Sequence, residues 1–140
     1  LDTKITLQQL FDIYDQAFNA PVPLKSQVSM DIGVTRFAAI LLITHRLGFT
    51  HQDPALADDV YTDLDQIAEN NRRYIPALAA ATLHKLVVNY PEQSQLRPNA
   101  PITQAEFASL IYQGLVATGK TNPIESDYIV QVNPLPNKNA

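Results

Sequence analysis

A threonine-led helical pattern occurs three times in the sequence, and it limits what the chain can fold into. The three segments are "ITLQQLFDIYDQAF" from Ile5, "VTRFAAILLITHRL" from Val34 and "ITQAEFASLIYQGL" from Ile102. In each segment a β-branched residue precedes the threonine, and apolar residues follow it at four, seven, eight and twelve positions. This spacing places the apolar residues on one face of an α-helix. The sequence therefore predicts three amphipathic helices around a shared core.

Residues that start and stop helices flank these patterns. Each threonine suits the N-cap, because its hydroxyl can accept an N–H group from the first turn. In the first and third segments Gln9 and Glu106 stand three residues later and can return the hydrogen bond, which closes a capping box, whereas Ala38 in the second cannot. Gly48 and Gly119 follow the second and third patterns and suit the position just beyond a helix.

A fourth helix is predicted over about residues 75–87, "IPALAAATLHKLV", because Pro76 suits a first turn and the alanines permit close packing. "DYIV" at residues 127–130 is interpreted as a short edge strand. Three proline-rich or acidic segments are predicted to be loops: residues 19–33, 49–60 and 89–101. The expected fold class is therefore all-α.

Composition excludes several classes of function. The chain has 140 residues, a formal net charge of -4 and a pI of about 5.2, so it lacks the basic surface typical of nucleic-acid binding. It contains no apolar run of about 18 residues, so no membrane span is expected. Cysteine is absent, which removes disulfides, thiolate catalysis and sulfur-ligated metals.

Other chemistry finds little support in the sequence. The three histidines, His45, His51 and His84, have no metal-ligand spacing, and the acidic run over residues 53–66 lacks the glycine and terminal glutamate of a calcium loop. No nucleophile elbow or Gly-rich phosphate loop is present. We therefore expect no catalytic residues, no cofactor and no metal. Arg72–Arg73 has two open interpretations, an exposed loop pair or an anion contact.

Three short motifs in a fixed order carry a family resemblance. "NYP" at residue 89, "RPN" at 97 and "ITQAEF" at 102 follow an Ala-rich helix and a "YTDL" start at 61. From Tyr61 to Leu115 the chain resembles an S-layer homology domain, most closely the cyanobacterial variants. The two earlier threonine-led segments resemble the closing helices of preceding repeats. Asp63 matches the family's aromatic-x-Asp position, where a structural turn role is expected.

The resemblance implies a division of the chain into four parts. Residues 1–33 would be a degenerate first element, 34–60 the closing helix and loop of a preceding repeat, and 61–130 a complete repeat. Residues 131–140 would be a tail or linker. Since the chain opens with Leu1 and has no signal segment, we expect it to be a piece of a longer, secreted precursor.

The resemblance also implies a fold and a function. The fold would be a pseudo-threefold helical bundle with three capped core helices, short outer helices and Pro-rich loops. The function would be non-catalytic anchoring in the periplasm or cell envelope, by binding a peptidoglycan-linked and often pyruvylated polysaccharide. A helix N-terminus beside an arginine suits the pyruvate carboxylate. The implied ligand-binding residues are Thr35, Arg36, Arg73, Tyr90, Thr103 and Gln104, with Arg36 as the main anion contact.

A second hypothesis rests on the positions where the sequence departs from the family pattern. Thr35–Arg36 keeps the family's Thr-Arg pair, but Gln104 and Leu7 replace the arginine at the other two helix starts. Under this hypothesis the chain is a structural or protein-interaction domain that kept the fold. Its partner would be another protein or a membrane complex, such as a β-barrel or other envelope protein in the same precursor or complex.

Overall fold

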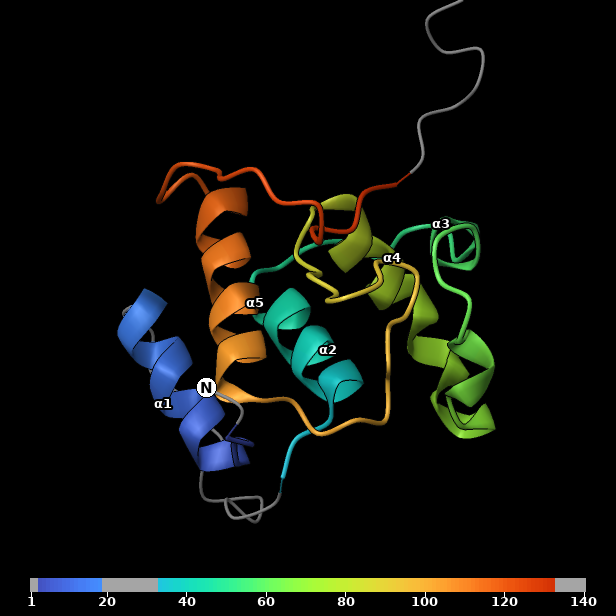
Figure 1. Cartoon of the computed structure of the whole chain (residues 1–140), viewed down its shortest axis with the longest axis horizontal. Coiled ribbons are helices and arrows are strands. Elements are labelled where there is room, and N and C mark those ends of the chain that lie inside the picture. Colours follow the sequence, from blue (N-terminus) through green and yellow to red (C-terminus); the bar gives the residue numbers. More distant parts are fainter. Residues whose placement is uncertain (1–2, 19–32, 133–140) are drawn as a thin grey trace, which may run out of the picture.

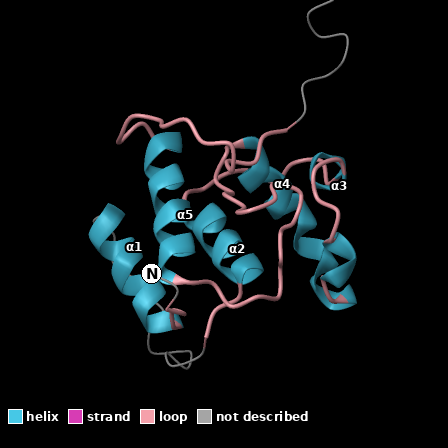
Figure 2. Ribbon diagram, in the orientation of Figure 1, coloured by secondary structure: helices cyan, strands magenta, loops and turns pink. Residues whose placement is uncertain are grey.

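Helices make up most of the computed structural model, which describes residues 3–18 and 33–132 (Figure 1). Within these residues no strand is formed, so the all-α prediction is confirmed (Figure 2). None of the described helices is long and apolar enough to cross a membrane. The α-helices are α1 (Leu7–Phe18), α2 (Arg36–Arg46), α3 (Ala55–Asp58), α4 (Ile75–Leu83) and α5 (Gln104–Ala117).

The predicted capping boxes of α1 and α5 are present. In α1 the Gln9 N–H donates to Thr6 Oγ1 at 3.3 Å, and the Thr6 N–H donates to Gln9 Oε1 at 2.9 Å. In α5 Glu106 and Thr103 exchange the equivalent hydrogen bonds at 3.2 and 2.9 Å. Each box satisfies two N–H groups that a helix start leaves without partners. A threonine cap of this kind contributes about 1 kcal/mol to stability.

Helix α2 has the predicted simpler cap and the predicted glycine stop. The Ala38 N–H donates to Thr35 Oγ1 at 3.1 Å, and alanine returns no hydrogen bond. Gly48 and Gly119 both have a φ of 77°, a left-handed conformation that glycine adopts without steric cost. Local residue choices therefore define both ends of α2 and both ends of α5.

The fourth helix is shorter than predicted. Helix α4 ends at Leu83 rather than near residue 87, because Lys85 adopts a left-handed φ of 61°. The Leu86 N–H then donates to Ala81 O at 3.0 Å, which completes a Schellman-type ending. Glycine usually occupies this position, so a lysine there does not indicate the end of a helix in the sequence.

Four other expectations need correction or fall, in part, outside the described residues. The predicted loop over 49–60 contains α3, and residues 64–74 form two 3₁₀ helices, η2 (Leu64–Gln66) and η3 (Glu69–Tyr74). The predicted edge strand over 127–130 makes one isolated bridge, Val88 to Ile129, which is too short for a strand. Of the predicted loop 19–33 and tail 131–140, residues 19–32 and 133–140 lie outside the described residues.

The three β-branched residues before the capping threonines form a closed ring of backbone hydrogen bonds. The Ile5 N–H donates to Ile102 O at 3.2 Å, the Ile102 N–H to Val34 O at 2.8 Å, and the Val34 N–H to Ile5 O at 3.4 Å. All three side chains are buried. The ring therefore ties together the starts of α1, α2 and α5, although these starts are far apart in the sequence.

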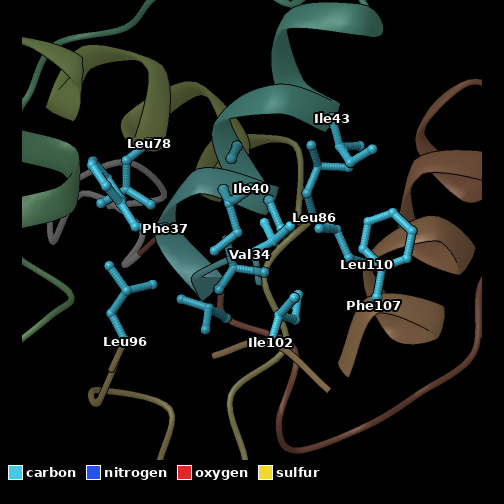
Figure 3. Packing of buried hydrophobic residues seen from close by; sticks show 14 of the residues in the cluster. Val34, Phe37, Ile40, Ile43, Leu78, Leu86, Leu96, Ile102, Phe107 and Leu110 are labelled. Atoms are coloured by element: carbon cyan, nitrogen blue, oxygen red, sulfur yellow. The ribbon is translucent and has the colours of Figure 1, made fainter. Parts of the chain in front are cut away.

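Helix α2 occupies the middle of the molecule. It packs against α4 on one side and α5 on the other, while α1 packs against α5 and α3 against α4 (Figure 1). Figure 3 shows Phe37, Ile40 and Ile43 of α2 pointing into the core. Phe107 and Leu110 of α5 lie on the same side as Ile43, whereas Phe37 lies beside Leu78 of α4 (Figure 3). Helix α2 is therefore enclosed on two sides by other helices.

Candidate functional site

A surface hollow of about 450 Å³ lies beside the N-terminal half of α5. It brings together two of the predicted site residues, Tyr90 and Thr103, with two that the sequence did not assign to it, Arg97 and Glu106. The residues that line it are Val88, Tyr90, Arg97, Thr103, Ala105, Glu106 and Ser109.

Arg97 supplies an accessible positive charge in this hollow. Its side chain is 40% exposed, and its Nη2 donates to Glu106 Oε2 at 2.7 Å. The buried carboxylate of Asp63 holds the backbone here, because it accepts the N–H groups of Leu96 and Arg97 at 3.0 and 2.8 Å. These bonds keep Arg97 at a left-handed φ of 51°. The structural role expected for Asp63 is therefore to position Arg97.

Arg36, the predicted main anion contact, is buried inside the protein. It is 3% exposed and is not among the residues that line the hollow. Its Nε donates to Leu96 O at 2.8 Å, its Nη2 donates to Asn89 Oδ1, and its Nη1 lies 3.1 Å from Glu106 Oε2. The guanidinium therefore joins two loops to α5 and reaches the hollow through Glu106.

The first turn of α2 is likewise occupied by other parts of the chain. The Arg36 N–H donates to Ala100 O at 2.8 Å, and the Phe37 N–H donates to Pro98 O at 3.1 Å. The third N–H of the turn bonds to the Thr35 hydroxyl. These donors are the groups that would hold an anion at a helix N-terminus. Because they are already bonded, Thr35 acts as a helix cap and α2 offers no such donors to a ligand.

Glu106 lies between the two arginines and is held in its ionised form. Burial raises the pKa of Glu106, but the Thr103 N–H, Arg97 and Arg36 together lower it below its ordinary value. Burial also lowers the pKa of Arg36, against the opposite effect of Glu106. An arginine nevertheless stays protonated at neutral pH. Two guanidinium groups therefore share one carboxylate, and this cluster has a surplus of one positive charge.

The surplus charge faces the hollow because of how the neighbouring groups are arranged. Arg36 is buried, so Arg97 carries the exposed part of the charge. A further carboxylate, Asp63, faces the backbone of Leu96 and Arg97 and is not among the residues lining the hollow. An anion entering the hollow would therefore meet the Arg97 guanidinium first.

Tyr90 provides an exposed aromatic surface on the same hollow. Its side chain is 65% exposed, and the centre of its ring lies 4.8 Å from the centre of the Tyr128 ring in an edge-to-face arrangement. The adjacent Asn89 is fully buried, donates to Gln93 O at 2.8 Å and accepts from Arg36. The chain next to Tyr90 is therefore anchored by the buried Asn89, while the Tyr90 ring stays exposed and contacts Tyr128.

The two remaining predicted site residues lie apart from this hollow. Arg73 is exposed on η3, where its guanidinium carbon lies 5.0 Å from the centre of the Tyr74 ring. Arg72 is half-buried and donates to a backbone carbonyl at 3.0 Å, so the pair divides into a structural and an exposed residue. Gln104 is the exposed first residue of α5, and its N–H donates to a backbone carbonyl at 2.7 Å.

Sequence reasoning missed Arg97 and Glu106 as partners in one site. Arg97 belongs to the "RPN" motif and Glu106 to the capping box, but no local spacing shows that their side chains meet. Within residues 3–18 and 33–132, no cluster of His, Asp or Glu could hold a metal ion. Comparison with protein-family models, curated proteins and solved structures finds no match for the chain.

Proposed function

We propose that this chain is a non-catalytic cell-envelope module that binds an acidic polysaccharide linked to peptidoglycan. The observation that carries the proposal is the pairing of an exposed tyrosine with a positively charged guanidinium in one hollow, at Tyr90 and Arg97. Its volume of about 450 Å³ is within the usual range for small-molecule sites, roughly 300–1,000 Å³.

Each residue has a role that follows from its chemistry. Arg97 binds a carboxylate, because a guanidinium presents two parallel donors to the two carboxylate oxygens. The Tyr90 ring covers the apolar face of a sugar, and the Ser109 hydroxyl, which donates to Ala105 O at 3.1 Å, accepts a hydrogen bond from its polar rim. Arg36 is a positioning residue that holds Glu106. We therefore propose Arg97, instead of Arg36, as the residue that binds the anion.

The sequence resemblance to S-layer homology domains supports the same proposal. In that family three capped helices form a pseudo-threefold bundle, and here α1, α2 and α5 would be those helices. The closed ring through Ile5, Val34 and Ile102 supports this arrangement, because each helix start donates to one neighbour and accepts from the other. The proposed location is the periplasm or cell envelope.

Co-sedimentation with purified sacculi that retain their polysaccharide tests the proposal. Wild-type protein should be retained, and Arg97→Ala should weaken binding about tenfold or more, since a charge-assisted hydrogen bond contributes about 1.5–3 kcal/mol. Arg73→Ala is the matched control, because it removes an exposed arginine outside the hollow and should bind like wild type. Thermal unfolding checks that both variants are folded.

Two outcomes would count against the proposal. Equal retention of Arg97→Ala and wild type would show that the hollow is not the binding site. Loss of binding in both arginine variants alike would indicate a general charge effect instead of a specific site. Tyr90→Ala provides a second variant of the hollow that leaves the charge unchanged, and it should also weaken binding.

A structural or protein-interaction domain is the second candidate. It is favoured by three exposed apolar side chains between residues 90 and 128, because exposed apolar groups often mark protein contacts. They are Tyr90, Ile124 and Tyr128, which are 65%, 59% and 37% exposed. This candidate predicts no retention on sacculi and a stable complex with a defined envelope protein. The same co-sedimentation experiment therefore separates the two functions.

A further inference from the structure

We infer that the glycan site continues along α5 beyond the first hollow, so that the ligand is a linear oligosaccharide with one acidic end. This inference rests on the proposed function and specifies its substrate class. It commits to a chain of several sugars, of which the unit nearest Arg97 carries the negative charge and the others are neutral.

Three neighbouring hollows form the continuous surface that this ligand requires. A second hollow of about 300 Å³ shares Val88 and Ser109 with the first. A third, of about 540 Å³, shares residues with the second and extends to the C-terminal part of α5, at Val116 and Ala117. Figure 1 shows the segment that follows α5 running from the C-terminal end of this helix back across the molecule. The second and third hollows lie between α5 and this segment, with shared lining residues Gln113, Ile124, Ser126 and Ile129.

Unused hydrogen-bonding capacity lies where the second and third hollows meet. Gln113 is 6% exposed, and its Nε2 donates to Lys85 O at 2.8 Å. In the part of the chain that the structure describes, no hydrogen bond reaches Gln113 Oε1. Ser126 Oγ accepts the Tyr128 N–H at 3.1 Å and keeps its own hydroxyl proton for another acceptor. A sugar has both donors and acceptors among its hydroxyl groups and could bond to each of these atoms.

Apolar surface alternates with these polar atoms. The Tyr112 side chain lines the second hollow, and its hydroxyl donates a hydrogen bond to Asn122 O at 2.6 Å. Ile124, which is 59% exposed, belongs to both the second and the third hollow. Apolar side chains beside single hydrogen-bonding groups suit a sugar ring, which has an apolar face and a polar rim. A chain of rings would therefore match the groove along its length.

The charges at the two ends of the groove set the polarity of the ligand. The first hollow is lined by one guanidinium, Arg97, and one carboxylate, Glu106, and the buried Arg36 behind Glu106 adds a second positive charge at this end. The third hollow is lined by two carboxylates, Glu125 and Asp127, and by one lysine, Lys85, so its carboxylates outnumber its lysine. A polymer with an acid group on every unit would be repelled at this end. The groove therefore favours a glycan whose acidic group lies only at the end bound by Arg97.

Affinity as a function of fragment length tests this inference. The probes are size-fractionated polysaccharide fragments released from purified sacculi by mild acid, measured by calorimetry. We expect wild-type protein to bind fragments of four or more sugars at least tenfold more tightly than the acidic terminal disaccharide. Ala108→Trp should abolish this gain but keep disaccharide binding, because Ala108 is exposed, lines the second hollow and is not part of the first.

A matched control and four outcomes make the result decisive. Ala55→Trp adds the same side chain at an exposed alanine of α3, which lines none of the three hollows, and should bind like wild type. Equal affinity of wild type for short and long fragments, or an unchanged gain in Ala108→Trp, would overturn the extended site and leave the proposed function standing. Tighter binding to peptidoglycan stem peptides than to glycan would overturn the choice of ligand. No binding at any fragment length would overturn the proposed function and the extension together.

Discussion

Helices α2 and α5 each begin after an N-cap threonine, yet the two helix starts have different surroundings. At α2 the pair Thr35–Arg36 is covered, with Arg36 3% exposed. At α5 the corresponding pair is Thr103–Gln104, and the space beside it is a hollow that Arg97 enters from the preceding loop. The arginine of the Thr-Arg pair at the helix start is buried, whereas the accessible arginine comes from the loop before α5.

One loop produces this difference. The segment from Leu96 to Ala100 lies over the start of α2, where its carbonyl groups accept hydrogen bonds from the Arg36 backbone, the Arg36 side chain and the Phe37 backbone. The same loop brings Arg97 to Glu106 on α5. Covering one helix start and supplying a charge to the other are therefore two results of a single loop conformation.

The largest effect is expected from Arg36→Ala, which tests whether the α2 arginine is structural. Removing a buried ion-pair partner costs about 3–5 kcal/mol, and here the buried Asn89 would also lose a hydrogen-bond donor. We expect a loss of about 3 kcal/mol in the free energy of unfolding, measured by urea denaturation. Arg97→Ala is the control and should cost less than about 1 kcal/mol, since its side chain is 40% exposed. Similar losses in the two variants would contradict the assigned roles.

Glu106→Gln should have an intermediate effect that depends on pH. The folded protein lowers the pKa of Glu106 below its ordinary value of 4.5, so its ionised form stabilises the fold at pH above 4.5. This contribution is lost as the pH falls through the lowered pKa. We expect Glu106→Gln to cost about 2 kcal/mol near neutral pH, since hydrogen bonds to charged groups contribute about 1.5–3 kcal/mol.

Denaturation of Glu106→Gln and wild type in parallel, from neutral pH to well below pH 4.5, measures this dependence. The difference between the two should shrink as the pH falls through the acidic range, because wild type then loses the same charge that the variant lacks. The other carboxylates titrate in both proteins and largely cancel in the difference. If the difference in the free energy of unfolding between wild type and Glu106→Gln stayed constant with pH, the Glu106 charge would not stabilise the fold.

The smallest effect is expected from the two threonines, which should be alike in stability and unlike in binding. Thr35→Ala and Thr103→Ala each remove an N-cap hydroxyl and should each cost about 1 kcal/mol by thermal unfolding. Thr103 lines the hollow and Thr35 does not, so only Thr103→Ala should reduce retention on sacculi. A loss of retention in Thr35→Ala alone would restore the α2 start as the binding site.

Features that depend on neighbours within one helical turn could be predicted from the sequence. The three capped helices, both capping boxes and both glycine stops follow from residues at most four positions apart. The end of α4 could not be predicted, because Lys85 adopts a conformation for which glycine is the usual signal. The sequence also predicted an edge strand over residues 127–130. Only the isolated bridge between Val88 and Ile129 forms there, because pairing of distant segments depends on tertiary packing.

The sequence by itself determined where the three main helices begin and which of their faces are apolar, because caps and helical periodicity are local properties. Only the tertiary structure decided which arginine is accessible. Arg36 is bonded to Asn89 and Leu96, which lie 53 and 60 positions further along the chain, and such contacts leave no periodic signal. Burial of Arg36 and exposure of Arg97 depend on the path of one loop over α2, and that path is fixed by backbone carbonyl groups that every residue type possesses.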